Sequence, residues 1–266
     1  MTTDRPPALF FRILGPTQVE RDGAALGIGG RVSRRMLAAL IAGGGQPVSD
    51  DTMAEHIWER PPARVVETLR VIAWRLREAL GPDGRILLPR SESGYALLLP
   101  PGMTDADLFG ERVTRGISQL HAGDAAGAVT TFEAALALWR GEPWADLAGT
   151  VELMGPRQAL AELFEAASEE LLAARLADGD TATVIAASRT AVAAGPYRER
   201  RWELLALALY RGGRQAEALA ELRRARQLLV REIGVEPGPA LRSLERRILA
   251  HDPGLLEPSV RELLYA

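Results

Sequence analysis

One stretch of the chain, residues 64–80 (RVVETLRVIAWRLREAL), has the hydrophobic period of an amphipathic helix. Four arginines border its polar side, and an arginine-edged helix is more often plain solvated surface than a reader of DNA bases. Such a helix can nevertheless enter a major groove while its long side chains reach phosphates on either side. The apolar face consists of Val65, Leu69, Ile72, Ala73, Leu76 and Leu80, the outer face of Glu67, Val71, Trp74 and Glu78, and the flanking arginines are Arg64, Arg70, Arg75 and Arg77.

The residues before this stretch predict a small antiparallel sheet followed by two helices. Three short β-prone runs are separated by Gly15-Pro16 and Asp22-Gly23, which are turn sequences. Helical spacing of apolar residues then predicts a first helix over residues 33–42 and a second over residues 51–58, with Asp50 among the residues that cap it. The three predicted strands cover residues 10–14, 17–21 and 24–28.

The residues after the arginine-edged helix predict a hairpin. Residues 81–84 (GPDG) end the helix, and two β-prone runs, residues 86–88 and 95–99, flank a turn over residues 89–94. Arg85 and Arg90 are expected on this hairpin. The order of sheet, three helices and hairpin is that of a winged helix-turn-helix, in which the third helix enters the major groove and the hairpin lies over the adjacent backbone.

Beyond Pro100-Pro101-Gly102 the sequence predicts about seven helices and no strand. Three glycine-led segments resemble one another, starting at Gly123, Gly179 and Gly213, and the last two lie 34 residues apart. This is the period of a tetratricopeptide helix pair. The first segment starts 56 residues before the second, so an insertion of about 22 residues, including residues 140–155, interrupts the repeat.

These patterns define the predicted organisation. We expect an α+β winged helix-turn-helix domain over residues 8–100, followed by an all-α, tetratricopeptide-like helical domain over residues 103–252. Residues 253–266 form a C-terminal tail, in which the short apolar segment 260–265 is expected either to dock or to lead to something outside this chain.

Composition excludes several kinds of site. The chain has no cysteine and no histidine pair at metal-ligand spacing, so we expect no metal site. All 32 basic residues are arginine, which rules out a P-loop lysine and a Schiff-base lysine. No catalytic triad, nucleotide loop or carboxylate pair can be assembled, so we predict a protein that is not an enzyme and needs no cofactor.

Charge and hydropathy change this picture little. The formal net charge is −3, but residues 1–100 carry 13 Arg and 11 acidic residues, which permits DNA binding in the first half of the chain. No segment resembles a signal peptide or a membrane span, so a cytoplasmic protein without membrane partners is expected.

Several segments resemble the SARP family, the bacterial activators of antibiotic biosynthesis. FRILGPTQVERDG, TLRVIAWRLREALGP and SGYALLL resemble the DNA-binding half of the family, and ALALWRGEPWADL and the sequence from Tyr197 to Pro253 look like its bacterial transcriptional activation domain. The resemblance covers residues 10–255. It implies binding to direct repeats in double-stranded promoter DNA near the −35 element, and a helical domain that supports a homodimer and contacts RNA polymerase and its sigma factor.

The outer face of the third helix departs from the family pattern. Members usually carry polar and basic side chains where this chain has Glu67, Trp74 and Glu78. Carboxylates are repelled by phosphates, although Glu can accept a hydrogen bond from cytosine N4, and Trp can contact either a thymine methyl group or a protein. The candidate DNA-binding residues are Arg64, Glu67, Arg70, Trp74, Arg75, Arg77, Glu78, Arg85 and Arg90.

The departure leaves an alternative function open. In it, the chain is a tetratricopeptide-like interaction module whose winged helix has lost or altered its DNA binding. Of the remaining aromatic residues, Trp58 and Tyr95 are expected in the core, and Trp139 and Trp202 between helices. Trp144, in a proline-flanked loop, is either a packing residue of the same kind or a hot spot for a partner.

Overall fold

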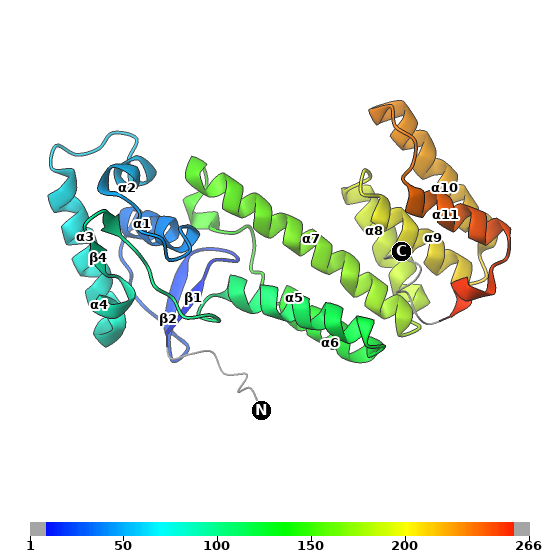
Figure 1. The fold of residues 1–266 in the computed structure, drawn as a ribbon, viewed down its shortest axis with the longest axis horizontal. Coiled ribbons are helices and arrows are strands. Elements are labelled where there is room, and N and C mark those ends of the chain that lie inside the picture. Colours follow the sequence, from blue (N-terminus) through cyan, green and yellow to red (C-terminus); the bar gives the residue numbers. More distant parts are fainter. Residues whose placement is uncertain (1–8, 258–266) are drawn as a thin grey trace. The chain divides into compact units, whose positions relative to one another are not determined.

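The computed structural model describes residues 9–257 (Figure 1), and the predicted apolar segment 260–265 lies outside them. The chain forms two compact units that do not follow one another along the sequence. The first unit contains the described residues up to Glu111 together with Ala135–Phe164, and the second contains Arg112–Ala134 and the described residues from Glu165 onward. The chain therefore crosses from unit to unit three times, and the predicted boundary between residues 100 and 103 stays a prediction.

The first unit starts with the predicted three-stranded antiparallel sheet, in the order β1 (Leu9–Arg12), β2 (Gln18–Arg21), β3 (Ala24–Ala25). Phe10 pairs with Glu20, and Phe11 with Val19. The β2–β3 turn has Asp22 and Gly23 at φ 51° and 83°, the left-handed pair that a two-residue hairpin turn requires and that Asp-Gly adopts readily.

Three helices follow, as predicted: α1 (Arg31–Ala42), α2 (Asp50–Ile57) and α3 (Val65–Ala79). The apolar face of α3 is buried against α1, α2 and the first sheet, and Phe11, Met36, Met53 and Tyr95 are almost fully enclosed in this core. The second helix starts one residue earlier than predicted, because the hydroxyl of Ser49 accepts a hydrogen bond from Thr52 N (3.1 Å) and thus caps α2. Asp50 lies inside the first turn instead.

The predicted strand over residues 86–88 is wrong. These residues belong to α4 (Gly84–Leu87) and the residue that ends it, so Arg85 lies on a helix and not on the hairpin. The cause is a tertiary contact: a Cβ on Gly84 would lie 2.2 Å from the carbonyl oxygen of Arg77, so the chain turns tightly against α3, and Leu87 and Leu88 are buried. The wing is a short hairpin of β4 (Arg90–Ser91) and β5 (Gly94–Tyr95).

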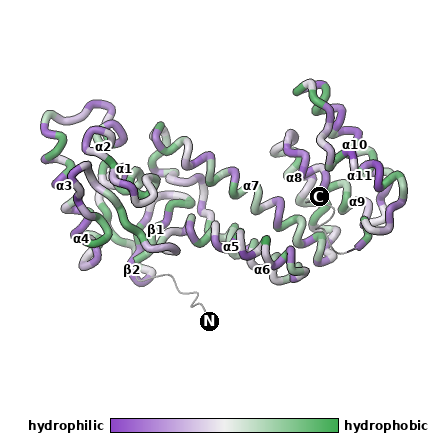
Figure 2. The backbone as a smooth tube through the Cα atoms, viewed as in Figure 1, coloured by the Kyte–Doolittle hydropathy of each residue, from purple (hydrophilic) through white to green (hydrophobic). Residues whose placement is uncertain are grey.

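Beyond the wing, the described residues contain seven α-helices, as predicted, and Figure 2 shows hydrophobic residues recurring between hydrophilic ones along α7. The helices α5 and α7 each contribute residues to both units. The bounds are α5 (Asp105–His121), α6 (Ala125–Leu136), α7 (Met154–Ala177), α8 (Thr181–Ala194), α9 (Glu199–Arg211), α10 (Gln215–Leu228) and α11 (Pro239–Leu249).

The three glycine-led segments are structurally equivalent. Gly123, Gly179 and Gly213 all have left-handed φ angles, between 74° and 91°, and each ends one helix and precedes the next. The residue after each glycine donates its N–H to the carbonyl five positions earlier, at 2.9 Å for Asp124, 2.9 Å for Asp180 and 2.8 Å for Arg214. The repeat predicted from the sequence is therefore a repeat of helix pairs with one turn geometry.

Candidate nucleic-acid interface

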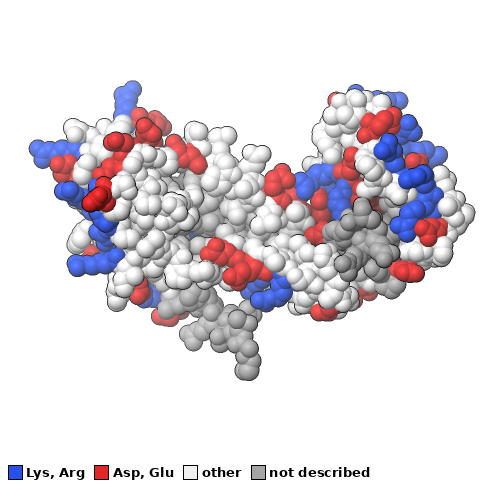
Figure 3. Space-filling model, in the orientation of Figure 1, with Lys and Arg blue, Asp and Glu red and all other residues white. Residues whose placement is uncertain are grey.

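The outer face of α3 is solvent-exposed, as its hydrophobic period predicts. Glu67, Trp74 and Glu78 are all exposed on it, and the exposed fraction of Trp74 is 57%. Val71, at 48%, adds a second exposed apolar side chain to this face. In Figure 3, acidic and basic side chains are interspersed over this part of the first unit. The face is thus mixed in charge with an apolar centre.

The arginines around this face differ in their surroundings. Within the described residues, no hydrogen bond or ion pair holds the guanidinium groups of Arg64, Arg70 and Arg75, all of which are exposed. Arg85, on α4, is likewise exposed and without a partner there. Exposed guanidinium groups that make no hydrogen bond within the protein are the donors that phosphate contacts use.

Arg77 and Arg90 instead hold the wing in place. Arg77 donates from Nε to the carbonyl oxygen of Leu88 (2.8 Å), which joins α3 to the start of the wing. Arg90, on β4, makes a two-pronged ion pair with Asp50 (2.5 and 2.7 Å), and its guanidinium lies 4.5 Å from the centre of the Tyr95 ring. The hydrogen bonds from Arg90 lower the pKa of Asp50, whose charge joins the wing to the first turn of α2.

A hollow runs along one side of α3. It is lined by the first turn of α1 and by Trp58 on one side, and by Arg64, Thr68, Val71 and Arg75 on the other. Trp58 is partly buried against the core, as expected, and Tyr95 is fully buried. Two of the unpaired arginines therefore border a concave surface.

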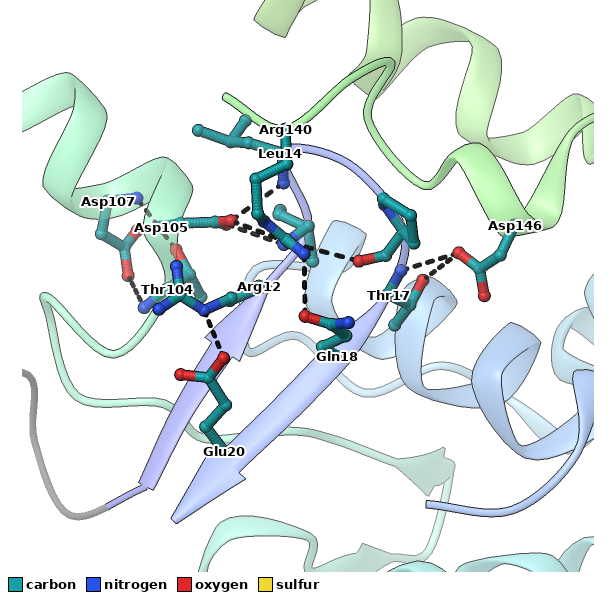
Figure 4. Close-up of polar contacts among 12 residues, drawn as sticks. Arg12, Leu14, Thr17, Gln18, Glu20, Thr104, Asp105, Asp107, Arg140 and Asp146 are labelled. Carbon is teal, nitrogen blue, oxygen red and sulfur yellow. Dashed lines mark hydrogen bonds and ion pairs between the residues drawn. The ribbon is translucent and has the colours of Figure 1, made fainter. Parts of the chain in front are cut away.

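Sequence reasoning missed the contacts that support the sheet beneath the helices (Figure 4). Asp105, at the start of α5, is fully buried, and its carboxylate accepts the N–H groups of Ile13 (2.7 Å) and Leu14 (3.1 Å). Arg140 lies 3.5 Å from the same carboxylate. Burial raises the pKa of Asp105 despite these contacts. No local pattern signals a contact between residues more than 90 positions apart.

A second carboxylate, that of Asp146, likewise accepts hydrogen bonds from the β1–β2 connection. Asp146 accepts both the N–H (2.7 Å) and the hydroxyl (2.9 Å) of Thr17, and it pairs with Arg34 of α1 (2.8 Å). The predicted insertion, residues 140–155, thus supplies part of the first unit. Trp144, 2% exposed, packs there against Ile13 and the helix α1, so it is a packing residue and not a partner hot spot.

The other two tryptophans also fill space between helices. The ring of Trp139 lies between those of Phe109 (5.5 Å) and Phe164 (4.6 Å), and Trp202 is buried with its Nε1–H donated to the carbonyl of Pro196 (2.8 Å). Among residues 9–257 there is no group of three or more side chains able to hold a metal ion. No helix of that range combines the length and the apolarity that a membrane crossing requires.

Comparisons with known proteins agree with this architecture. The profile of the bacterial transcriptional activator domain matches residues 104–249. The chain is 34% identical to the transcriptional regulator RedD of Streptomyces coelicolor, over 97% of this chain and 77% of that protein. It is 37% identical to the regulatory protein AfsR of the same species over 95% of this chain, although it spans only about a quarter (25%) of AfsR.

A solved structure shows the same fold over nearly the whole chain. It is Mycobacterium tuberculosis EmbR in complex with a low-affinity phosphopeptide, with a TM-score of 0.88 and 32% sequence identity, covering 96% of this chain and 68% of that one. A winged helix followed by this helical domain defines a bacterial transcriptional regulator and not an enzyme. The chain belongs to the SARP family of such regulators, those with a bacterial transcriptional activator domain.

Proposed function

We propose that this regulator binds double-stranded promoter DNA, with α3 in the major groove and the β4–β5 wing over the adjacent backbone. The observation that carries the proposal is the exposed outer face of α3, bordered by Arg64, Arg70 and Arg75, whose guanidinium groups make no hydrogen bond or ion pair within the described residues. These three groups contact phosphates on the two sides of the groove, and Arg85 reaches the backbone from α4. Arg77 and Arg90 act indirectly, by fixing the wing.

The centre of the face reads bases in this proposal. Glu67 and Glu78 oppose general attraction to phosphate, and each can accept a hydrogen bond from the N4 amino group of cytosine. Trp74 contacts a thymine methyl group. A good base contact is worth roughly 1–3 kcal/mol of discrimination between bases. These side chains therefore lower the affinity for random DNA and raise the selectivity for the specific site.

The proposed role is activation of a secondary-metabolite, or antibiotic, gene cluster in the cytoplasm. Membership of the SARP family, whose resemblance implies activation of antibiotic biosynthesis, supports this role. Each protomer of a homodimer binds one of two direct repeats, and the helical domain contacts RNA polymerase and its sigma factor. Solenoid-like helix pairs present extended surfaces that suit protein partners better than small molecules.

One observation favours a second candidate function. Trp74 and Val71 expose apolar surface at the centre of α3, which is the kind of anchor that protein interfaces use. In this alternative the winged helix has been diverted to a protein, and the chain is a tetratricopeptide-like interaction module with lost or altered DNA binding.

Binding isotherms for promoter DNA with direct repeats and for scrambled DNA separate the two functions. Glu78→Arg should raise affinity for scrambled DNA and lower the ratio of specific to scrambled affinity, because it replaces a repelled charge with an attracted one. Trp74→Ala should weaken specific binding if it contacts a base. If Glu78→Arg changes neither isotherm, α3 does not face DNA and the interaction module is the better account.

A further inference from the structure

The second unit contains a groove between α10 and α11 that the proposed DNA contacts do not use. Its floor is apolar, formed by Leu222, Pro237 and Leu241, all three buried, and its sides carry Arg226, Arg242 and Arg246 together with Glu236 and Glu245. We infer that this groove binds an acidic peptide segment of a partner protein, with an apolar side chain on the floor and carboxylates on the arginines. The inference stands whether or not α3 binds DNA.

The backbone around the groove is held in place. After α10 the chain makes a π-helical turn, Leu229–Ile233, and reverses at Gly234, whose φ of 77° is left-handed. At the start of α11, Gly238 donates its N–H to the Glu199 carboxylate (2.7 Å), and the prolines on either side of Gly238 restrict the backbone further. The groove is therefore formed before any partner arrives, which lowers the entropic cost of binding.

Two of the three groove arginines are available to an acidic ligand. Arg242 and Arg246, four residues apart on one face of α11, are exposed and have no ion pair within the described residues. Arg226 pairs with Glu236 at the rim (2.9 Å), where both side chains are more than half exposed. Glu245 lies between Arg242 and Arg246 in the sequence of α11, so the lining carries three arginines and two glutamates. Figure 3 shows arginines gathered over α10 and α11.

An apolar floor distinguishes a peptide from a nucleic acid as the occupant. Phosphate backbones offer nothing to bury against Leu222 and Leu241, whereas a leucine-type side chain does. An amphipathic acidic segment with apolar residues at helical spacing matches both the floor and the charges.

The test uses the full chain and a fluorescein-labelled, acetylated 16-residue helical peptide, with leucines at i, i+4 and i+7 and glutamates at most other positions. Fluorescence anisotropy should show saturable binding, and a peptide with lysines in place of the glutamates should not bind. Arg242→Glu/Arg246→Glu should weaken acidic-peptide binding at least tenfold, because two attractive contacts become repulsive. Arg242→Lys/Arg246→Lys, which keeps the charge, should stay close to wild type.

The matched control is Arg115→Glu, which reverses the charge of an exposed arginine on α5 outside the groove. This variant should bind the peptide with wild-type affinity. Absence of wild-type binding, or equal binding by the double Glu variant, overturns the inference. A 20-base-pair random duplex is titrated in parallel. If the double Glu variant loses affinity for the duplex but not for the peptide, the groove is a nucleic-acid surface and the inference is wrong.

Discussion

Buried and half-buried carboxylates stabilise the first unit by pairing with backbone N–H groups and with arginines. Asp105 satisfies two backbone N–H groups that the interior would otherwise leave unpaired, a loss that costs about 1–3 kcal/mol. Because burial raises its folded pKa, its contribution to the free energy of unfolding falls as pH rises from the ordinary value of 3.8 to that raised value. The contribution of Asp50 to the free energy of unfolding depends on pH in the opposite direction, because its ion pair with Arg90 lowers its folded pKa.

We predict that the Asp50–Arg90 ion pair makes a pH-dependent contribution to the free energy of unfolding. Its contribution is present above the ordinary Asp pKa of 3.8 and is lost as pH falls through the lowered folded value. Asp50→Asn should therefore lower the free energy of unfolding near pH 7, by roughly 0.2–1 kcal/mol for a partly exposed pair, and should cost less at an acidic pH below the ordinary value of 3.8. Urea titrations at both pH values measure the difference. An equal cost at the two values would show that the charge of Asp50 contributes nothing.

At the scale of elements, the sequence predicted what local periodicity controls. The buried and exposed faces of α3 follow from its 3.6-residue period, and the helix-pair repeat follows from the spacing of Gly179 and Gly213. The hairpin of the wing was predicted, but its first strand was misplaced. Residues 86–88 have β-prone side chains, yet the close approach of Gly84 to Arg77 makes the segment helical. Packing against α3 overrode local preference there.

The role of the predicted insertion, residues 140–155, in the first unit can be tested by mutation. Trp144 is almost fully buried between the β1–β2 connection and α1, so Trp144→Ala should destabilise the protein by about 3–5 kcal/mol through lost burial and a cavity. Trp139→Phe, which keeps an aromatic ring between two others, is the control and should cost much less. Thermal unfolding followed by circular dichroism measures both variants. A small effect of Trp144→Ala would mean that the insertion is not part of the winged-helix core.

In the whole molecule, the winged-helix fold is completed by residues that lie within the bacterial transcriptional activator domain. The first unit uses Asp105, Arg140, Trp144 and Asp146, all of which follow the predicted linker at residues 100–102. Such sharing means that the activator domain helps to build the surface that we propose for DNA. This sharing of residues could not be predicted from the sequence, because two domains that follow one another along the chain are expected to have two independent cores.

A truncation tests this sharing. A fragment of residues 1–102 lacks all four of these side chains and leaves the N–H groups of Ile13 and Leu14 without their acceptor. It should unfold at lower urea concentration than a fragment of residues 1–164, which contains the complete first unit. Equal midpoints for the two fragments would show that residues 1–102 form an independent domain.

Docking of the arginine-bordered face of α3 on promoter DNA is tested by the salt dependence of binding. Affinity of the full chain for a direct-repeat promoter duplex is measured at several salt concentrations for wild type, Arg75→Ala and Arg115→Ala. Loss of one phosphate contact should flatten the slope of log K against log salt by about one in Arg75→Ala and leave Arg115→Ala unchanged. If Arg75→Ala keeps both the wild-type affinity and the wild-type slope, this face of α3 does not dock on DNA.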